Sequence, residues 1–337
     1  MSDGAGIGLG KYSAQKISSL KDAEPKHRVQ RLKWQKPDYT IKYGKNIALV
    51  GEPMVGKTIL GLLFGYFNRE YINDIRDAGY DKVVELLKAD ILPEIRKIVV
   101  LEPENKLIAA MNDGVEKLLL KPFKDNDTID IIPIPITRKE QKFKNDKVIT
   151  ARREHIEEMK DQFDMEVGYI VDEVDEHTLF MIDSMTDYKK LLDDRFGLLF
   201  EVINKKNIAS LEGVDTYRQA HYASRNTWWE NLMKRKRGFR GWNIDTYKES
   251  ETPERFLKAG EDPVKTKWVG GTEHNLDMVY RIIKITDTNR RIKILNGRYL
   301  PAEPEQHEFA YPLLSKMGAM PLIEAMAEKL LLGETAE

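Results

Sequence analysis

The sequence predicts an α/β fold in which helices flank a mostly parallel sheet. Short apolar segments that suit buried strands alternate along the chain with longer segments that have the spacing of helices. The first apolar segment, KNIALV, leads into a glycine-containing turn and then into the apolar, proline-free segment TILGLLFGYF. Near the end of the chain, the pattern MVYRIIKITDTNRRIKILNGRY indicates a C-terminal β-hairpin with its turn near residues 286–290.

The predicted elements continue this alternation along the chain. Residues 1–40 are polar and glycine-rich and then basic, which indicates a flexible arm. The core is expected over 41–300, and charged residues at helical spacing indicate a helical insertion near 71–96. Apolar runs predict further strands ending near Leu101, over 128–136, at the start of 177–192 and over 241–250. Charged or amphipathic runs predict helices over 146–165, in the rest of 177–192, over 215–239 and in a tail within 301–337.

Composition excludes several kinds of chemistry. The chain has no cysteine, so disulfides, zinc–thiolate sites and cysteine nucleophiles are excluded. Lys and Arg total 54 while Asp and Glu total 55, so any contact with nucleic acid must come from a local basic patch. No run of about 18 apolar residues occurs, and the N-terminus lacks the apolar centre of a signal peptide. We therefore expect no membrane contact and a cytoplasmic location, in the host cytoplasm if the protein is viral.

The turn after KNIALV has the residues needed to hold a nucleoside triphosphate. GEPMVGKT matches the phosphate-loop (P-loop) pattern G-x-x-x-x-G-K-[ST] and lies between a predicted strand and a predicted helix. Its two glycines permit a tight turn whose N–H groups face inward and bind anions. Lys57 is expected to reach the β- and γ-phosphates of ATP, and the Thr58 hydroxyl is expected to bind Mg²⁺. The predicted nucleotide-binding residues of this segment are Gly51, Glu52, Pro53, Met54, Val55, Gly56, Lys57, Thr58 and Ile59.

Acidic residues at the ends of two other predicted strands complete the expected site. Asp183 follows the apolar run TLFMI, at the strand end where open α/β sheets bind ligands, and we expect it to hold Mg²⁺ together with Thr58. The run IVVLEPEN ends with Glu102 and Glu104. A carboxylate beside the γ-phosphate can orient and polarise the attacking water, so both glutamates are catalytic candidates beside Lys57.

The order of these segments resembles the core of RecA-like ATPases, a group that includes RecA-type recombinases and KaiC-like and DnaB-like ATPases. The resemblance rests on the P-loop, VLEPENKL, IDSMTDY and WNIDTYKE, and it covers about Lys45 to Lys284. The segment Tyr217–Glu249 is similar to single-domain RecA-like ATPases of phages, archaeal viruses and their hosts. The family implies a catalytic Glu104 if the chain follows RecA-type members, and a catalytic Glu102 if it follows DnaB-like members.

The resemblance also implies a γ-phosphate sensor and an oligomer. Thr246 is the sensor candidate, although Tyr247 and Lys248 follow it where the family has Ala-His. In RecA-like rings a basic residue near the last strands reaches the neighbouring subunit's nucleotide site, and the pair formed by Lys265 and Lys267 lies where such a residue would fall. A homo-oligomer, either a ring or a filament, is therefore expected.

One segment, RNTWWENLMKRKRGFRGW, interleaves cations with aromatic residues and is a candidate for binding single-stranded DNA. The candidates for phosphate contacts are Arg225, Lys234, Arg235, Lys236, Arg237 and Arg240, and the candidates for base stacking are Trp228, Trp229 and Phe239. The alternative is a helix whose tryptophans belong to the core and whose basic last turn complements the helix dipole.

The leading interpretation is an ATP-binding and ATP-hydrolysing protein that acts on DNA in recombination, replication or repair. A nucleoside or nucleotide kinase would use the same loop, and Arg152 and Arg153 are its lid candidates. A viral DNA-packaging type ATPase is a further alternative. A GTPase has no support, because the segment INKKN has Asn207 where the guanine-binding motif has an acid. A structural protein that binds nucleotide without turnover disagrees with the joint presence of Lys57, Thr58, Asp183 and a nearby Glu.

Overall fold

A computed structural model describes residues 44–134 (except 78, 91, 93, 105, 113–120 and 122), 146–206, 214–251, 264–297 (except 288) and 306–310. The predicted N-terminal arm lies outside these residues, and so does the predicted C-terminal helix PLIEAMAEKLLL. Within the described residues, no helix is both long enough and apolar enough to cross a bilayer.

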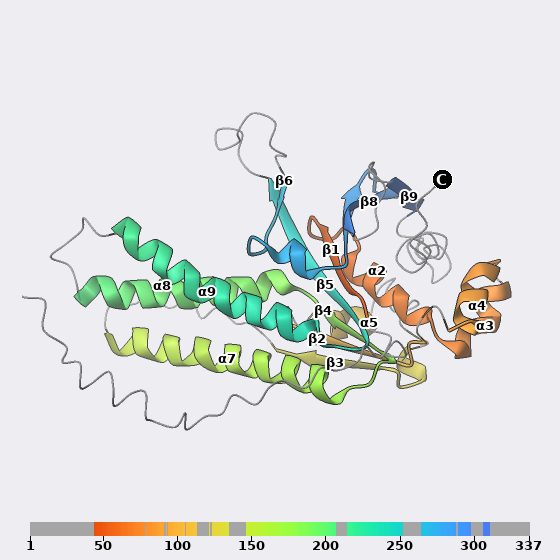
Figure 1. Cartoon of the computed structure of the whole chain (residues 1–337), viewed down its shortest axis with the longest axis horizontal. Coiled ribbons are helices and arrows are strands. Elements are labelled where there is room, and N and C mark those ends of the chain that lie inside the picture. The colour runs from red at the N-terminus through yellow and green to blue at the C-terminus, as the bar shows by residue number, and fades with distance from the viewer. Residues whose placement is uncertain are drawn as a thin grey trace, which may run out of the picture. The chain divides into compact units, whose positions relative to one another are not determined.

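The centre of the fold is a mixed, mostly parallel sheet. In the described part of the chain its strands run in the order β3-β2-β4-β5-β1-β7-β8-β9, with β6 paired to the far end of β5 (Figure 1). The pairs from β3 through to β7 are parallel, while β7–β8, β8–β9 and β5–β6 are antiparallel. The strand bounds are β1 Asn46–Gly51, β2 Lys97–Glu102, β3 Ile129–Pro133, β4 Thr178–Ile182, β5 Trp242–Glu251, β6 Val264–Thr266, β7 Met278–Lys284, β8 Asn289–Gly297 and β9 Gln306–Ala310.

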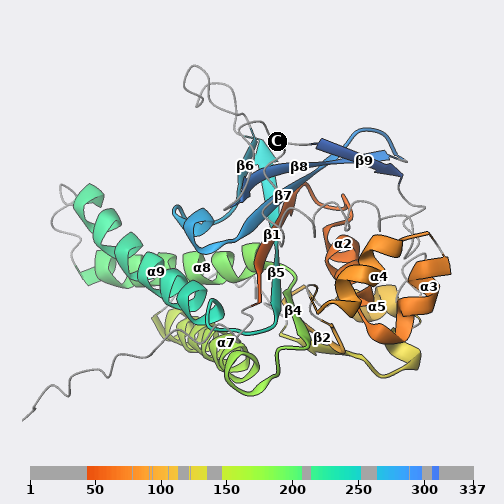
Figure 2. The same ribbon diagram turned by 45° about the vertical axis from the view of Figure 1, so that its right-hand side comes forward.

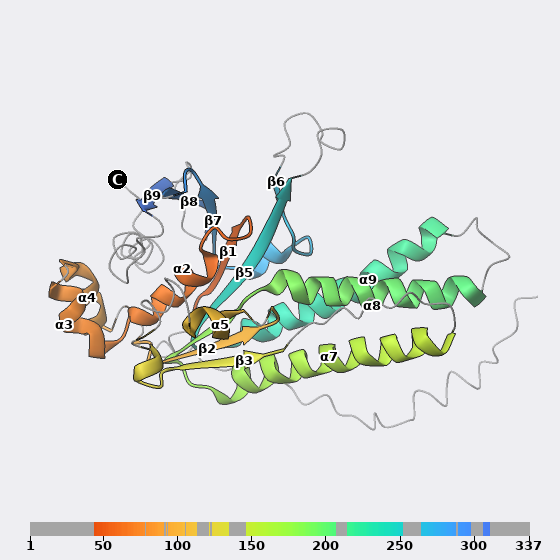
Figure 3. The same cartoon turned by 180° about the vertical axis from the view of Figure 1, so that it is seen from behind.

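Helices cover both faces of this sheet. The three long helices α7, α8 and α9 lie side by side on one face, and α2 with the short helices α3 and α4 lies on the other (Figures 1 and 3). The helix bounds are α2 Lys57–Leu63, α3 Ile72–Asp77, α4 Asp81–Lys88, α5 Leu107–Asn112, α7 Asp146–Glu173, α8 Met185–Lys206 and α9 Val214–Lys236, and the 3₁₀ turns are η1 Phe64–Tyr66, η2 Arg69–Tyr71 and η5 Thr272–Asn275.

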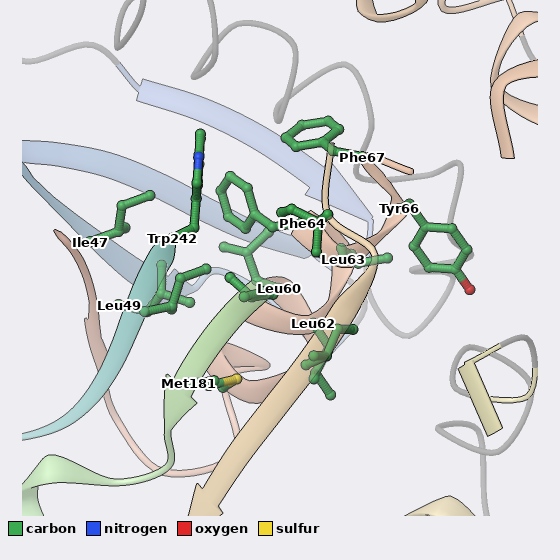
Figure 4. Close-up of a cluster of buried hydrophobic side chains, with 14 of the residues drawn as sticks. Ile47, Leu49, Leu60, Leu62, Leu63, Phe64, Tyr66, Phe67, Met181 and Trp242 are labelled. Carbon is green, nitrogen blue, oxygen red and sulfur yellow. The ribbon is translucent and has the colours of Figure 1, made fainter. Parts of the chain in front are cut away.

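The α2 face is a continuous apolar core. The helix α2 has buried side chains around most of its circumference, because its sequence KTILGLL has no charged residue after the first position. The Phe64 ring packs against the Trp242 ring, with 5.5 Å between centroids. Figure 4 shows these side chains together with Ile47, Leu49, Leu60, Leu62, Leu63, Tyr66, Phe67 and Met181.

The opposite core lies beneath the three long helices and contains two residues that the sequence offered for DNA stacking. Trp229 of α9 is 1% exposed, and its indole N–H donates to the Thr272 hydroxyl at 2.8 Å. Phe239 is also 1% exposed and packs edge-on against Phe180. Both rings are therefore core residues, and the prediction that they stack on bases is wrong. The spacing of Trp229 on α9 suited either role, and its packing against η5 decides between them, while Phe239 follows α9 and packs against β4.

A buried ion pair joins the end of α9 to β5. Lys236 Nζ contacts an oxygen of Asp245, and both side chains are 1% exposed or less. The Tyr247 hydroxyl donates to the other Asp245 oxygen at 3.3 Å. Burial lowers the pKa of Lys236 and raises the pKa of Asp245, because both charges are removed from water. The pair fixes the last turn of α9 against the strand that carries Thr246.

Most of the predicted strands and helices are present, with several differences of extent. The hairpin of β7 and β8 is confirmed, with its turn where the sequence placed it (Figure 2). The predicted insertion near 71–96 forms the two short helices α3 and α4, and α7 runs to Glu173, beyond its predicted end. Within the predicted helical tail, Gln306–Ala310 is instead the strand β9, which pairs with β8. A strand of five residues has a weak pattern of its own, and it forms here because β8 offers an unpaired edge.

Replacing Lys236 with Met should lower the free energy of unfolding by about 3–5 kcal/mol, because Asp245 would be left as an unpaired buried charge. The loss should be smaller at about pH 5 than at about pH 8. Burial raises the pKa of Asp245, so the folded variant binds a proton more readily than the unfolded chain as the pH falls. Chemical denaturation at both pH values measures these differences.

The matched control is Lys234→Met on the same helical turn. Lys234 is 66% exposed and lies 3.7 Å from Glu230, so its loss should change stability by less than about 1 kcal/mol. Equal stability of the two variants at the higher pH would contradict a stabilising role for the buried pair.

Candidate functional site

The candidate site lies where four parallel strands end. Because β1, β5, β4 and β2 are parallel neighbours, their carboxyl ends meet along one edge of the sheet. The P-loop follows β1, Asp183 follows β4, and Glu102 is the last residue of β2. The sheet therefore brings together residues that lie far apart in the sequence, at the edge where open α/β sheets bind their ligands.

The P-loop has the backbone conformation that its glycines predict. Gly56 precedes α2 with φ of 99°, a left-handed conformation that glycine adopts without strain. A Cβ at Gly51 would lie 2.5 Å from the Ile282 carbonyl oxygen of β7, so this position has no room for a side chain. The loop between them is exposed at Met54, whose side chain is 91% exposed. The residues after β1 thus form a tight, open turn directly before a helix, as an anion-binding loop requires.

An arginine from the β7–β8 hairpin holds this loop from the side opposite the acids. Arg290 is buried, and its Nε donates to the Val55 carbonyl oxygen at 3.2 Å. Its Nη1 donates to the carbonyl oxygen of Thr286 at 2.7 Å and to that of Asn289 at 3.1 Å. The guanidinium group therefore links the hairpin turn to the P-loop.

Lys57 occupies the interior of the loop. Its Nζ donates to the Gly51 carbonyl oxygen at 3.0 Å and to the Glu52 carbonyl oxygen at 2.5 Å. Burial lowers the pKa of Lys57 to about 8, and the nearby Asp183 opposes this shift. An anion in the loop would supply the negative charge that this ammonium group lacks.

Asp183 connects the loop to two strands. Its Oδ2 accepts a hydrogen bond from the Thr58 hydroxyl at 2.5 Å, and its Oδ1 accepts one from the Thr246 hydroxyl. A cis peptide bond joins Asp183 to Ser184. Thr58, Asp183 and Thr246, which the sequence predicted as parts of one site, are therefore in direct contact.

The two candidate glutamates have different surroundings. Glu102 is 2% exposed, and its Oε1 accepts from the backbone N–H groups of Lys106 and Leu107 at the start of α5. Its Oε2 is buried without a hydrogen-bond partner among the described residues. Burial raises the pKa of the Glu102 carboxyl, and the nearby Asp183 adds to this effect.

Glu104 is more accessible, with a side chain that is 23% exposed. It contacts two ammonium groups, that of Lys248 from β5 and that of Lys106, the latter at 2.8 Å. Lys248 also reaches Asp187 in the first turn of α8, at 3.0 Å. Of the two glutamates, Glu104 is thus the one whose side chain solvent can approach.

The residues at this edge fit a magnesium ion shared with a ligand. No group of three or more His, Asp or Glu side chains that could hold a metal occurs in the described ranges. Mg²⁺ differs from zinc in this respect, because it commonly binds one or two protein oxygens and completes its shell with water and phosphate. Thr58 and Asp183 supply two adjacent oxygens, and the unpartnered Oε2 of Glu102 is a buried acceptor on the neighbouring strand.

Other predicted residues lie elsewhere. The Ile59 side chain is buried in the α2 core, so only its backbone could contact a nucleotide. Lys265 on β6 and the following Lys267 are exposed, and their predicted role in a neighbouring subunit stays a prediction. Arg152 and Arg153 fall within α7, and Asn207 lies outside the described residues.

The basic segment of α9 does not form the continuous DNA-binding patch that the sequence indicated. Lys236 is buried, and Arg235 pairs with Asp172. Arg225 pairs with Asp193 at 2.7 Å, and the Trp228 ring lies under the cations of Lys160 and Arg195. Arg225, Arg235 and Lys236 are therefore paired with acids within the fold, and Lys234 lies 3.7 Å from Glu230. Lys234, Arg237 and Arg240 are exposed.

Two residues that the sequence analysis gave no role contact this site. Arg290 holds the loop, and Lys248 holds Glu104. The one available signal was the departure at Lys248 from the family's usual ending after the sensor. Neither a scan against models of protein families nor a search of curated proteins found a match to this chain. The function is therefore inferred from the geometry of the site.

Replacing Glu102 with Ala should lower the free energy of unfolding by about 1–3 kcal/mol, because two backbone N–H groups would lose their shared acceptor. Glu102→Gln keeps an acceptor oxygen and should cost less. Glu104→Ala is the matched control two residues along, and it should cost less than about 1 kcal/mol because its ion pairs are partly exposed. Denaturant titration of the three variants measures the order, and a larger loss for Glu104→Ala would reverse the assigned roles.

Proposed function

We propose that this protein is a Mg²⁺-dependent ATPase of the RecA-like type that hydrolyses the γ-phosphate of ATP. One observation carries the proposal, namely that the Thr58 hydroxyl in the P-loop helix lies 2.5 Å from the Asp183 carboxylate at the end of β4. These residues are 125 positions apart, and a P-loop Ser/Thr beside a strand-end Asp is the pair that holds Mg²⁺ in P-loop enzymes. The strands with acid-x-Glu, IDS and Thr246 run parallel to β1 in the order β2-β4-β5-β1, in keeping with the RecA-like resemblance.

The chain's own residues divide the work of binding. The backbone N–H groups of residues 51–58 other than Pro53 surround the phosphates, and Lys57 neutralises the oxygens of the β- and γ-phosphates. Thr58 and Asp183 would hold the metal ion, and Mg²⁺ when bound would supply positive charge at the phosphate oxygens. The Thr246 hydroxyl donates to the other oxygen of Asp183. As a γ-phosphate sensor it would contact the terminal phosphate.

Glu104 is the proposed general base. A water oxygen forms a bond to the γ-phosphorus while the bond from that phosphorus to the bridging oxygen breaks, which gives ADP and inorganic phosphate. Glu104 accepts the proton that the water loses. Glu102 supports this strand end through its hydrogen bonds to the start of α5, and its fixed, buried position suits it less well for receiving a proton from solvent.

Action on DNA and assembly into a ring or filament are separate proposals that rest on the RecA-like resemblance. A kinase needs an acceptor pocket and a cationic lid, and no observation in the described part of the chain favours one. A DNA-packaging type ATPase would use the same nucleotide site, so the geometry of this site does not favour it over the leading proposal.

Lys57→Ala should abolish ATP hydrolysis and weaken ATP binding, because no other residue of the loop has a positive charge that could neutralise the phosphates. Glu104→Gln should retain bound ATP while its turnover falls by about 100-fold or more, as removal of a general base predicts. ATP binding by calorimetry and phosphate release measure the two effects. Lys88→Ala on the exposed side of α4 is the control and should behave as the unchanged protein.

Full turnover by a folded Lys57→Ala variant would remove the ATPase proposal. If Glu102→Gln rather than Glu104→Gln retains ATP and stops turnover, the general base is Glu102.

The DNA proposal needs a variant that leaves the buried ion pair intact. Changing Lys234, Arg237 and Arg240 together to Gln should preserve folding, because all three are exposed. If they bind phosphates, the affinity of the variant for single-stranded DNA should drop. The dependence of this affinity on salt should also become weaker, because fewer counterions are released on binding when phosphate contacts are lost. Fluorescence anisotropy at two salt concentrations measures both. Unchanged affinity and salt dependence would show that this turn of α9 does not bind DNA.

A further inference from the structure

Lys248 lies beside the P-loop although it is about 190 residues away from it in sequence. In the parallel pairing of β5 with β1 it stands opposite Gly51, the first residue of the loop. It is also two residues beyond Thr246 on the same strand, so both side chains leave the strand on the same face. Its ammonium group is close enough to Lys57 to contribute to the lowered pKa of that lysine. Two lysines therefore converge on the place where the phosphates of ATP would lie.

Lys248 is one of two lysines whose ammonium groups contact the carboxylate of Glu104, the proposed general base. Lys248 Nζ contacts Oε1 of Glu104, while Lys106 Nζ lies 2.8 Å from Oε2. Both carboxylate oxygens of Glu104 are thus in contact with ammonium groups. Two ammonium groups beside a carboxylate favour its ionised form, so Glu104 accepts a proton from water more readily once one of the lysines leaves.

The surroundings of Lys248 permit its ammonium group to move while its backbone stays in place. Its backbone N–H donates to the Thr186 hydroxyl at 2.9 Å, which fixes the strand. Its second carboxylate partner is Asp187, which has other donors, the Ser184 hydroxyl at 2.5 Å and Lys190 at 2.6 Å. Departure of Lys248 would therefore leave Asp187 paired. The four-carbon stem of a lysine allows its ammonium group to exchange between anions with the backbone unchanged.

We propose that Lys248 binds the γ-phosphate of ATP in the same subunit and that this exchange releases Glu104 to act on water. The inference rests on the proposed ATPase function and adds a regulation to it. ADP has no γ-phosphate, so with ADP bound Lys248 stays on Glu104. The terminal phosphate of the substrate thereby frees the base that removes it.

The test compares the affinities for ADP and for a non-hydrolysable ATP analogue, AMP-PNP, both with Mg²⁺, measured by calorimetry. The readout is the ratio of the ADP dissociation constant to the AMP-PNP dissociation constant. Lys248→Met should reduce this ratio by about tenfold or more, since a charge-assisted contact to the γ-phosphate is lost. Lys190→Met is the matched control, because Lys190 also pairs with Asp187 and does not share the Glu104 contact. It should leave the ratio within about twofold of that of the unchanged protein.

A second variant moves the ratio in the opposite direction and does not depend on the folding of the first. Glu104→Gln removes the charge that competes for Lys248, so AMP-PNP affinity should rise relative to ADP affinity. The double variant Lys248→Met/Glu104→Gln should lose this rise. A residue with a merely structural role would not shift the ratio in two directions.

The outcomes separate this inference from the function on which it rests. If both nucleotides bind the unchanged protein but neither variant alters the ratio, the role of Lys248 is wrong and the ATPase proposal stands. If neither nucleotide binds the unchanged protein, both proposals are overturned.

Discussion

The proposed function depends on the meeting of Asp183 with the two hydroxyl groups of Thr58 and Thr246. Thr58 lies on α2 after β1, Asp183 follows β4, and Thr246 lies on β5. The strands β4, β5 and β1 are parallel neighbours at the centre of the sheet. The contact can form because β4, β5 and β1 are adjacent and because β4 and β1 end beside the part of β5 that carries Thr246. The apolar cores on the two faces provide this by fixing the strands between α2 and the three long helices. The packing of apolar side chains thus sets the relative positions of the polar groups at the site.

Buried charge serves two different purposes in this fold. Lys236 and Asp245 neutralise each other within the core, so this pair does not require a ligand. At the site, Lys57 is buried against carbonyl oxygens, and one oxygen of Glu102 has no partner among the described residues. The first arrangement stabilises one structure. The arrangement at the site leaves the Lys57 ammonium without an anionic partner in hydrogen-bond contact and Glu102 Oε2 without a donor among the described residues. A phosphate and a cation could supply these interactions, which distinguishes a binding site from a structural ion pair.

Sequence alone could predict the elements whose pattern is local. The strand before the P-loop, the strands ending in Glu102 and Asp183, and the β7–β8 hairpin are apolar runs with clear boundaries, and the structure contains them. It could not predict β6 or β9, because strands of three and five residues form by pairing with an existing edge. It could not separate core from surface in the basic segment of α9 either. The sequence around Trp229 and Lys236 fits both a core position and a surface position. The partners that place them in the core, Thr272 and Asp245, are known only from the structure.

The grip of Arg290 on Val55 has a consequence for how this protein can be divided. The P-loop begins at Gly51, yet one group that holds it comes from the second strand of the hairpin, 235 residues after Val55. A shortened chain that ends after β5 would contain every residue of the P-loop and every acid of the site, and would lack this support. The smallest fragment expected to keep the loop in its present shape must therefore continue through β8. A fragment that continues to Ala310 would also keep β9, which pairs with β8.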